Sequence, residues 1–279
     1  VAEVAIVIDE RSVQAMRLNA PFLCRLILDS LAGCFPTGAP VECHELHAFL
    51  DRSDHAQYKV VIFPNLFLVD GEIQAKVDRL KNAGRTLIFS FAAGFATDCR
   101  GSRAFSMESA SRLTGMDLAE ARSDMPLSIW MDPDRVPLTD GDDIRFGWLC
   151  PEIPVKPIFS IADPAVTPLG FLHSGNPGFG MRRHVEWTGV FSAAPCIPPE
   201  ILRKIFHGAG VHVFTGSGDV VYANRSLLAC SASSRGVKTI VMPGRETLRD
   251  ALTGEILAAE HGKHAVFMKR HETRIFWRE

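Results

Sequence analysis

The chain has 279 residues, of which 47% are hydrophobic, and it is therefore long enough to bury the cores of two ordinary domains. Its formal net charge is −2, with basic residues interspersed among acidic ones, so it lacks the electrostatic footprint of a protein that binds nucleic acid or an anionic membrane. No apolar run reaches the roughly 20 residues of a membrane-spanning helix. The seven cysteines are scattered without a CxxC pair, which argues against a disulfide framework or a zinc ribbon and favours reduced thiols in a cytoplasmic protein.

The first ninety residues alternate between strand patterns and helix patterns. Runs of β-forming residues mark buried strands, and apolar residues at helical spacing mark the segments between them. Asp70 is predicted to cap the second helix and Gly84 to end it, as Gly33 is predicted to end the first. The predicted elements are a strand at 4–8, a helix at 21–33, a strand at 58–63, a helix at 70–84 and a strand at 86–91. This order predicts a parallel sheet of the flavodoxin or class I amidotransferase type.

Beyond this region the pattern weakens and then changes. Residues 98–180 are rich in Pro, Gly and Asp and are predicted to form peripheral hairpins and loops, whereas 186–193 read as another sheet strand with a helix from Pro198 to Gly208. The last seventy residues contain short strand patterns at 211–214, 220–223, 226–231, 238–242, 265–269 and 273–277. The predicted fold class is therefore α/β: a flavodoxin/amidotransferase-like domain over residues 1–209, followed by a small antiparallel β domain over residues 210–279.

The segment 85–95 is predicted to be a buried strand that runs into a tight turn, where an amidotransferase-like α/β domain would carry its nucleophile. Chemistry there requires a thiol or a hydroxyl beside a base. Residues 92–94 are Ala-Ala-Gly and supply neither, so we predict no catalytic residue in this turn. A displaced nucleophile, Cys99 or Ser90, is the alternative, and it would make the chain a free-standing amidotransferase-like hydrolase.

Open α/β sheets bind ligands at the carboxyl ends of their parallel strands. Asp9, Asn65, Ser90 and Trp187 are predicted to lie near that edge, which makes them the candidate ligand pocket. Polar side chains at strand ends also complete backbone hydrogen bonds, and we favour this structural role for them.

Metal and phosphate sites find little support in the sequence. The pairs His44-x-x-His47 and His261-x-x-His264 lack the third and fourth ligands that zinc requires. The glycine-rich stretch 175–180 is not followed by a helical pattern, so we expect an ordinary loop rather than a phosphate cradle. We predict no metal and no cofactor.

Three stretches carry a family resemblance. They are Tyr58-Lys-Val-Val-Ile-Phe-Pro-Asn-Leu-Phe with the helix end Lys81-Asn-Ala-Gly84, then Arg85-Thr-Leu-Ile-Phe-Ser-Phe-Ala-Ala-Gly94, and finally Pro198 to Gly210 with Val211-His-Val-Phe, Asp219-Val-Val-Tyr-Ala-Asn224 and Gly236-Val-Lys-Thr-Ile-Val-Met-Pro243. Together they resemble the C-terminal region of family 42 β-galactosidase-like glycoside hydrolases. The resemblance implies an amidotransferase-like trimerisation domain and a small β domain that follow a catalytic barrel absent from this chain. It implies no catalytic residue here.

The expected function is therefore that of a non-catalytic accessory and oligomerisation region of a glycoside hydrolase. By the resemblance, the expected partner is further copies of the chain in a trimer. Two alternatives stay open: the hydrolase with a displaced nucleophile, and a carbohydrate-binding module that holds a sugar with Trp148, Trp187 or Trp277.

Overall fold

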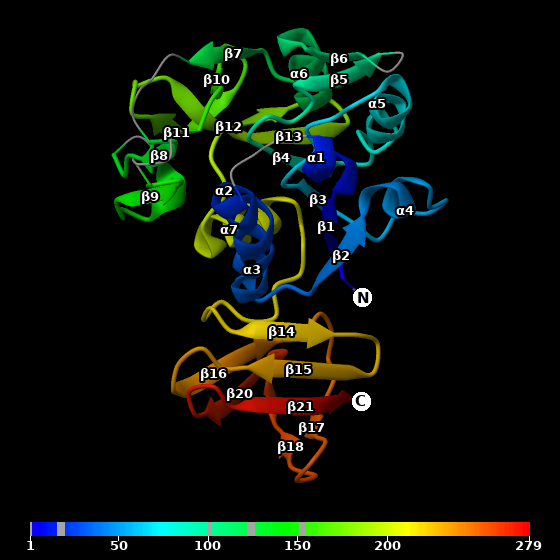
Figure 1. Ribbon diagram of the computed structural model, residues 1–279. Helices are drawn as coiled ribbons and strands as arrows, with labels where there is room; N and C mark the ends of the chain where they lie inside the picture. Colours follow the sequence, from blue (N-terminus) through cyan, green and yellow to red (C-terminus); the bar gives the residue numbers. More distant parts are fainter. Residues whose placement is uncertain (1, 16–19, 100–101, 122–125, 135, 151–154) are drawn as a thin grey trace.

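The structure is a computed structural model that describes residues 2–15, 20–99, 102–121, 126–134, 136–150 and 155–279 (Figure 1). The helical elements in these ranges are α1 (Glu10–Ala15), α2 (Ala20–Cys24), η1 (Arg25–Asp29), α3 (Ser30–Cys34), η2 (Phe35–Thr37), α4 (Leu46–Leu50), α5 (Gly71–Asp78), α6 (Met107–Thr114), η3 (Pro137–Thr139) and α7 (Pro199–Gly208). The strands up to residue 192 are β1 (Val4–Ile8), β2 (Val41–Glu45), β3 (Val60–Phe63), β4 (Arg85–Ser90), β5 (Ala96–Cys99), β6 (Ser102–Phe105), β7 (Leu118–Ala121), β8 (Ser128–Met131), β9 (Ile144–Gly147), β10 (Ile158–Ile161), β11 (Thr167–Leu172), β12 (Pro177–Arg183) and β13 (Trp187–Ser192).

A large mixed sheet organises the first part of the chain. Its strand order within the described residues is β2-β1-β3-β4-β13-β12-β11-β8-β9. The first five of these strands are parallel to one another, and the remaining four join in antiparallel fashion. The prediction of an α/β fold around a parallel sheet is confirmed at this level.

The prediction of only peripheral hairpins and loops over residues 98–180 is wrong, because β8, β9, β11 and β12 extend the central sheet. The glycines in β12 make this strand look like a loop in the sequence. A Cβ on Gly178 would lie 2.6 Å from Ile129 Cδ1, and one on Gly180 would lie 2.6 Å from Val166 Cγ1. The stretch predicted to be an ordinary glycine-rich loop is thus mostly a strand whose glycines admit neighbouring side chains.

The predicted helices form, but with different ends. The first passes through a π-helical turn at Arg25–Asp29, contains Gly33 within α3, continues through η2 and ends at Gly38, which has φ 79°. Asp70 caps α5 as predicted, since its Oδ1 accepts from Ile73 N at 2.8 Å. That helix ends at Asp78, however, so Gly84 lies in the turn before β4 and does not end α5.

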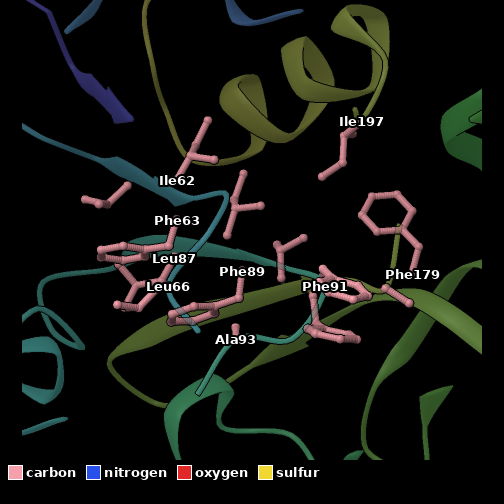
Figure 2. Packing of buried hydrophobic residues seen from close by; sticks show 14 of the residues in the cluster. Ile62, Phe63, Leu66, Leu87, Phe89, Phe91, Ala93, Phe179 and Ile197 are labelled. Atoms are coloured by element: carbon pink, nitrogen blue, oxygen red, sulfur yellow. The ribbon is translucent and has the colours of Figure 1, made fainter. Parts of the chain in front are cut away.

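Helices lie on both sides of the parallel strands. Figure 1 shows α3 and α7 together on the side nearer the C-terminal part, and α5 and α6 on the other side. Because both faces are covered, every residue of β3 and β4 is buried. Figure 2 shows aromatic side chains of this core, among them Phe63, Phe89 and Phe179.

The C-terminal part is built from short antiparallel strands with a core of their own. The strands are β14 (Val220–Ala223), β15 (Leu227–Ser231), β16 (Gly236–Val241), β17 (Leu248–Asp250), β18 (Ile256–Leu257), β19 (Ala259–Glu260), β20 (Lys263–Met268) and β21 (Thr273–Arg278). They form two sheets, β14-β15-β21-β17-β18 and β16-β20-β19. Leu228, Ile240, Met268 and Phe276 belong to the enclosed apolar cluster. The predicted antiparallel β region is confirmed, whereas residues 211–214 are not a strand and instead connect the two parts.

Two buried carboxylates hold the C-terminal part together. Burial alone would raise the pKa of Asp219, but hydrogen bonds, chiefly from Lys238 Nζ at 2.8 Å, outweigh it and hold that pKa below its ordinary value. Burial likewise acts to raise the pKa of Asp250, yet the Thr253 N–H and Arg274 Nε bind the carboxylate and lower its pKa to about 2. Both groups therefore stabilise the fold in their ionised form. None of the helices in the described ranges combines the length and the apolar character needed to cross a bilayer.

Candidate functional site at the carboxyl edge of the parallel sheet

Asp9 and Asn65 meet at the carboxyl edge because they follow the adjacent parallel strands β1 and β3. Both polar atoms of the Asn65 side-chain amide bind the Asp9 backbone: Oδ1 accepts from Asp9 N at 3.0 Å, and Nδ2 donates to Asp9 O at 2.8 Å. Both residues are buried. The side chain of Asn65 thus ties together the ends of two strands.

The Asp9 carboxylate is held from within the protein. Its Oδ1 accepts from Arg11 N at 3.0 Å, and its Oδ2 accepts from Ser12 Oγ. Ser12 Oγ in turn accepts from the backbone N–H of Phe67 and Leu68, at 3.0 and 2.8 Å. Burial raises the pKa of Asp9, although these hydrogen bonds act in the opposite direction. These polar groups satisfy one another's hydrogen bonds, and they connect the segment after β1 to the segment after β3.

Ser90 lies at the same edge but is inaccessible. It is the last residue of β4, pairs with Ser192 of β13 and is 5% exposed. The sequence therefore placed three of its four candidate residues, Asp9, Asn65 and Ser90, on the correct edge. Their proposed use as a ligand pocket remains a prediction.

The turn after β4 begins at Phe91, whose backbone conformation is unusual. Phe91 has φ 54°, a strained value for a residue with a Cβ, directly after the strand. Its ring is 1% exposed and packs edge to face on three others, with centroid distances of 5.0 Å to Phe22, 5.8 Å to Phe67 and 5.8 Å to Phe159. The first side chain after β4 is therefore an aromatic ring enclosed in the core. The sequence gives no local signal for this φ value, since Phe rarely adopts it.

Trp187 does not lie at the carboxyl edge of the sheet, so the prediction that places it there is wrong. It is the first residue of β13 and pairs in parallel register with Arg85, the first residue of β4. Parallel strands align their first residues at the amino edge, so Trp187 lies at the opposite edge from Ser90. There its ring stacks on His184, with centroids 4.3 Å apart, and Lys81 Nζ lies 5.1 Å from the ring centroid.

The other candidate residues are dispersed. Cys99 is the last residue of β5, and its side chain is not among those that the structure describes. Trp148 is 7% exposed and Trp277 is 45% exposed. His264 binds two backbone carbonyls, at 3.1 Å each. Across the described residues, no group of three or more His, Cys, Asp or Glu side chains could hold a metal ion.

No family model and no curated protein matches this sequence. The fold, however, is found within solved glycoside hydrolases. A β-galactosidase from Bacillus circulans sp. alkalophilus matches with a TM-score of 0.70 and 16% identity, over 100% of this chain and 41% of its own. Gan42B, a GH42 β-galactosidase from G. stearothermophilus, matches with a TM-score of 0.64 and 13% identity, over 100% of this chain and 40% of its own.

An α-L-fucosidase from Paenibacillus thiaminolyticus, isoenzyme 2, matches with a TM-score of 0.62 and 13% identity, over 100% of this chain and 48% of its own. At such identities the likeness establishes the fold. The predicted resemblance to a part of the family 42 β-galactosidases is confirmed in that sense. The chain spans less than half the length of these three enzymes.

Proposed function

We propose that this chain is a non-catalytic accessory region of a β-galactosidase-like glycoside hydrolase and supports its oligomerisation. The observation that carries the proposal is the pattern of coverage. The whole of this chain matches about two fifths of each β-galactosidase, as a region that accompanies a separate catalytic part would. Phe91, enclosed where an amidotransferase-like nucleophile would stand, supports a role without chemistry in this chain.

The finer description of the fold is part of this proposal. Numbered in chain order, the five parallel strands run 2-1-3-4-5, which is the order of flavodoxin-like sheets and supports a flavodoxin or class I amidotransferase-like domain. Two domains, 1–209 and 210–279, are supported by two separate apolar clusters that change over between Val213 and Phe214. The six described cysteines are free thiols, which supports a cytoplasmic location.

The assembly we propose is a trimer, with the closed cyclic symmetry usual for homo-oligomers. Sedimentation analysis of the full chain over a range of concentrations tests it. We expect a single trimeric species whose mass does not change on dilution into the micromolar range. A monomer of 30.7 kDa at high micromolar concentration would contradict the assembly role.

One observation favours a second function, carbohydrate binding. Tyr222, Ile275 and Trp277 are all exposed and share one face of the sheet, because Tyr222 and Ile275 both pair with Ala229 and Trp277 follows two residues later. Exposed aromatic rings on one face of a sheet suit stacking on a sugar, and Tyr222 and Ile275 also line a hollow next to Pro40 and Val41. The test is tryptophan fluorescence during titration with galactosides. A sugar-dependent change lost in Trp277→Ala and kept in Trp130→Ala, another exposed tryptophan, would support this function, and an unchanged spectrum would dismiss it.

A further inference from the structure

A pocket of about 640 Å³ opens at the amino edge of the central sheet, far from the carboxyl-edge residues described above. It lies between the segment that follows α4 and the C-terminal end of α5, two helices that are neighbours on the right of Figure 1. The lining side chains that matter here are Arg52, His55, Lys76, Arg79, Asn82 and Arg85. Its volume falls within the range of about 300–1,000 Å³ typical of small-molecule sites.

The pocket is strongly cationic. Four basic side chains line it against one carboxylate, Asp51. That carboxylate is bound by Lys76 Nζ at 2.6 Å, and Lys76 also binds Glu72 at 2.6 Å. Within the described part of the chain, Arg52, Arg79 and Arg85 have no carboxylate within ion-pair distance. Three guanidinium groups that form no ion pair therefore line one cavity, with Asp51 as an electrostatic neighbour of Arg79.

Arg85 is the fixed element of this pocket. Its side chain is buried, and it donates Nε–H to Tyr58 O at 2.8 Å, Nη1–H to Leu80 O at 2.8 Å and to Asn82 Oδ1 at 3.1 Å, and Nη2–H to His55 O at 3.1 Å. These bonds hold the guanidinium in one orientation and occupy four of its five N–H donors. The charge itself is not neutralised, which is costly for a buried ion. Burial accordingly lowers the pKa of Arg85.

Arg52 and Arg79 are the movable elements. Both side chains are exposed and make no hydrogen bond within the described residues. Arg52 only rests near the Tyr58 ring, with its guanidinium carbon 5.7 Å from the centroid. Flexible guanidinium groups beside a fixed one can close around a small ligand that offers several oxygen acceptors.

We propose that this pocket binds a phosphate group, either as free phosphate or as the phosphomonoester of a small molecule. A tetrahedral dianion supplies acceptors for the remaining Arg85 donor and for the forks of Arg52 and Arg79. It also neutralises charge that the protein leaves unpaired. The site is separate from the carboxyl edge and from the proposed assembly role.

Isothermal titration calorimetry of the full chain at low ionic strength tests the proposal, with inorganic phosphate, glucose 6-phosphate and uncharged glucose as the probes. We expect phosphate or glucose 6-phosphate to bind, glucose to give no heat, and added sodium chloride to weaken binding. Comparison of the two anions distinguishes free phosphate from an ester. Arg52→Gln and Arg79→Gln should each weaken binding by about tenfold, the effect of losing one charge-assisted hydrogen bond.

The matched control is Arg225→Gln, which removes an exposed arginine from the turn between β14 and β15. It should leave the affinity unchanged. Because Arg52 and Arg79 are exposed, their variants should keep the thermal midpoint of the parent chain, so a loss of binding can be read directly. Absence of heat with both anions would overturn the proposal. Equal affinities in Arg79→Gln and Arg225→Gln would overturn it as well.

Discussion

Gly38 lies where the α/β part and the C-terminal part meet, and its replacement offers a sharp test of that junction. Its carbonyl oxygen accepts from Phe214 N at 2.9 Å. A Cβ built on Gly38 would lie 1.9 Å from Thr215 O and 2.9 Å from Thr215 C, both backbone atoms that a rotamer change cannot move. Gly38→Ala must therefore push the two parts of the chain away from each other.

The expected cost has two components. The φ of 79° places an alanine in the left-handed region, at about 1–2 kcal/mol. The forced displacement of packed backbone adds about 1–3 kcal/mol, the usual cost of overpacking. Gly84→Ala provides the matched control, because Gly84 has φ 71° and a Cβ added there would have no atom within 4 Å, so only the first component applies.

The measurement is the free energy of unfolding in urea for the parent chain and both variants. We expect Gly84→Ala to lose about 1–2 kcal/mol and Gly38→Ala to lose about 2–5 kcal/mol. Equal losses for the two variants would show that Gly38 and Thr215 do not approach as closely as described, and the reasoning would then fail.

Phe91→Ala should lower the free energy of unfolding by about 3–5 kcal/mol, as expected for a buried aromatic side chain, and a loss under about 1 kcal/mol would show that its ring is not enclosed. Lys238→Met leaves the buried Asp219 carboxylate without its cation and should cost about 3–5 kcal/mol in urea unfolding. Because the pKa of Asp250 is lowered to about 2 in the folded chain, its stabilising contribution is complete above its ordinary pKa of 3.8 and disappears as the pH falls towards 2. The thermal midpoint should fall less steeply over this range in Asp250→Asn. A fluorophosphonate probe should leave Ser90 unmodified, and labelling that is lost in Ser90→Ala would instead support the hydrolase alternative.

The parallel half of the fold is predictable because its signals are local. The runs Val60–Phe63 and Leu87–Phe89 are apolar at every position, as expected for strands covered on both faces. The antiparallel extension of the sheet cannot be predicted in this way, because Gly178 and Gly180 in β12 are required by packing against side chains distant in the sequence. The glycine content of this segment alone suggests a loop.

The candidate site divides in the same way. Asp9 and Asn65 follow recognisable strands, so the edge they share can be predicted. Trp187 was misplaced because a parallel strand's direction decides which of its ends meets the ligand edge, and Trp187 begins its strand. The cationic pocket has no sequence signature, since packing brings Arg52 after α4 and Arg79 after α5 next to Arg85 at the start of β4.

The intact mass of the native protein, isolated from its own cells and assayed for β-galactosidase activity, tests the central claim most directly. We expect a polypeptide much heavier than 30.7 kDa, in which this chain is joined to a catalytic region that carries the activity. A native polypeptide of 30.7 kDa that hydrolyses a β-galactoside by itself would contradict it.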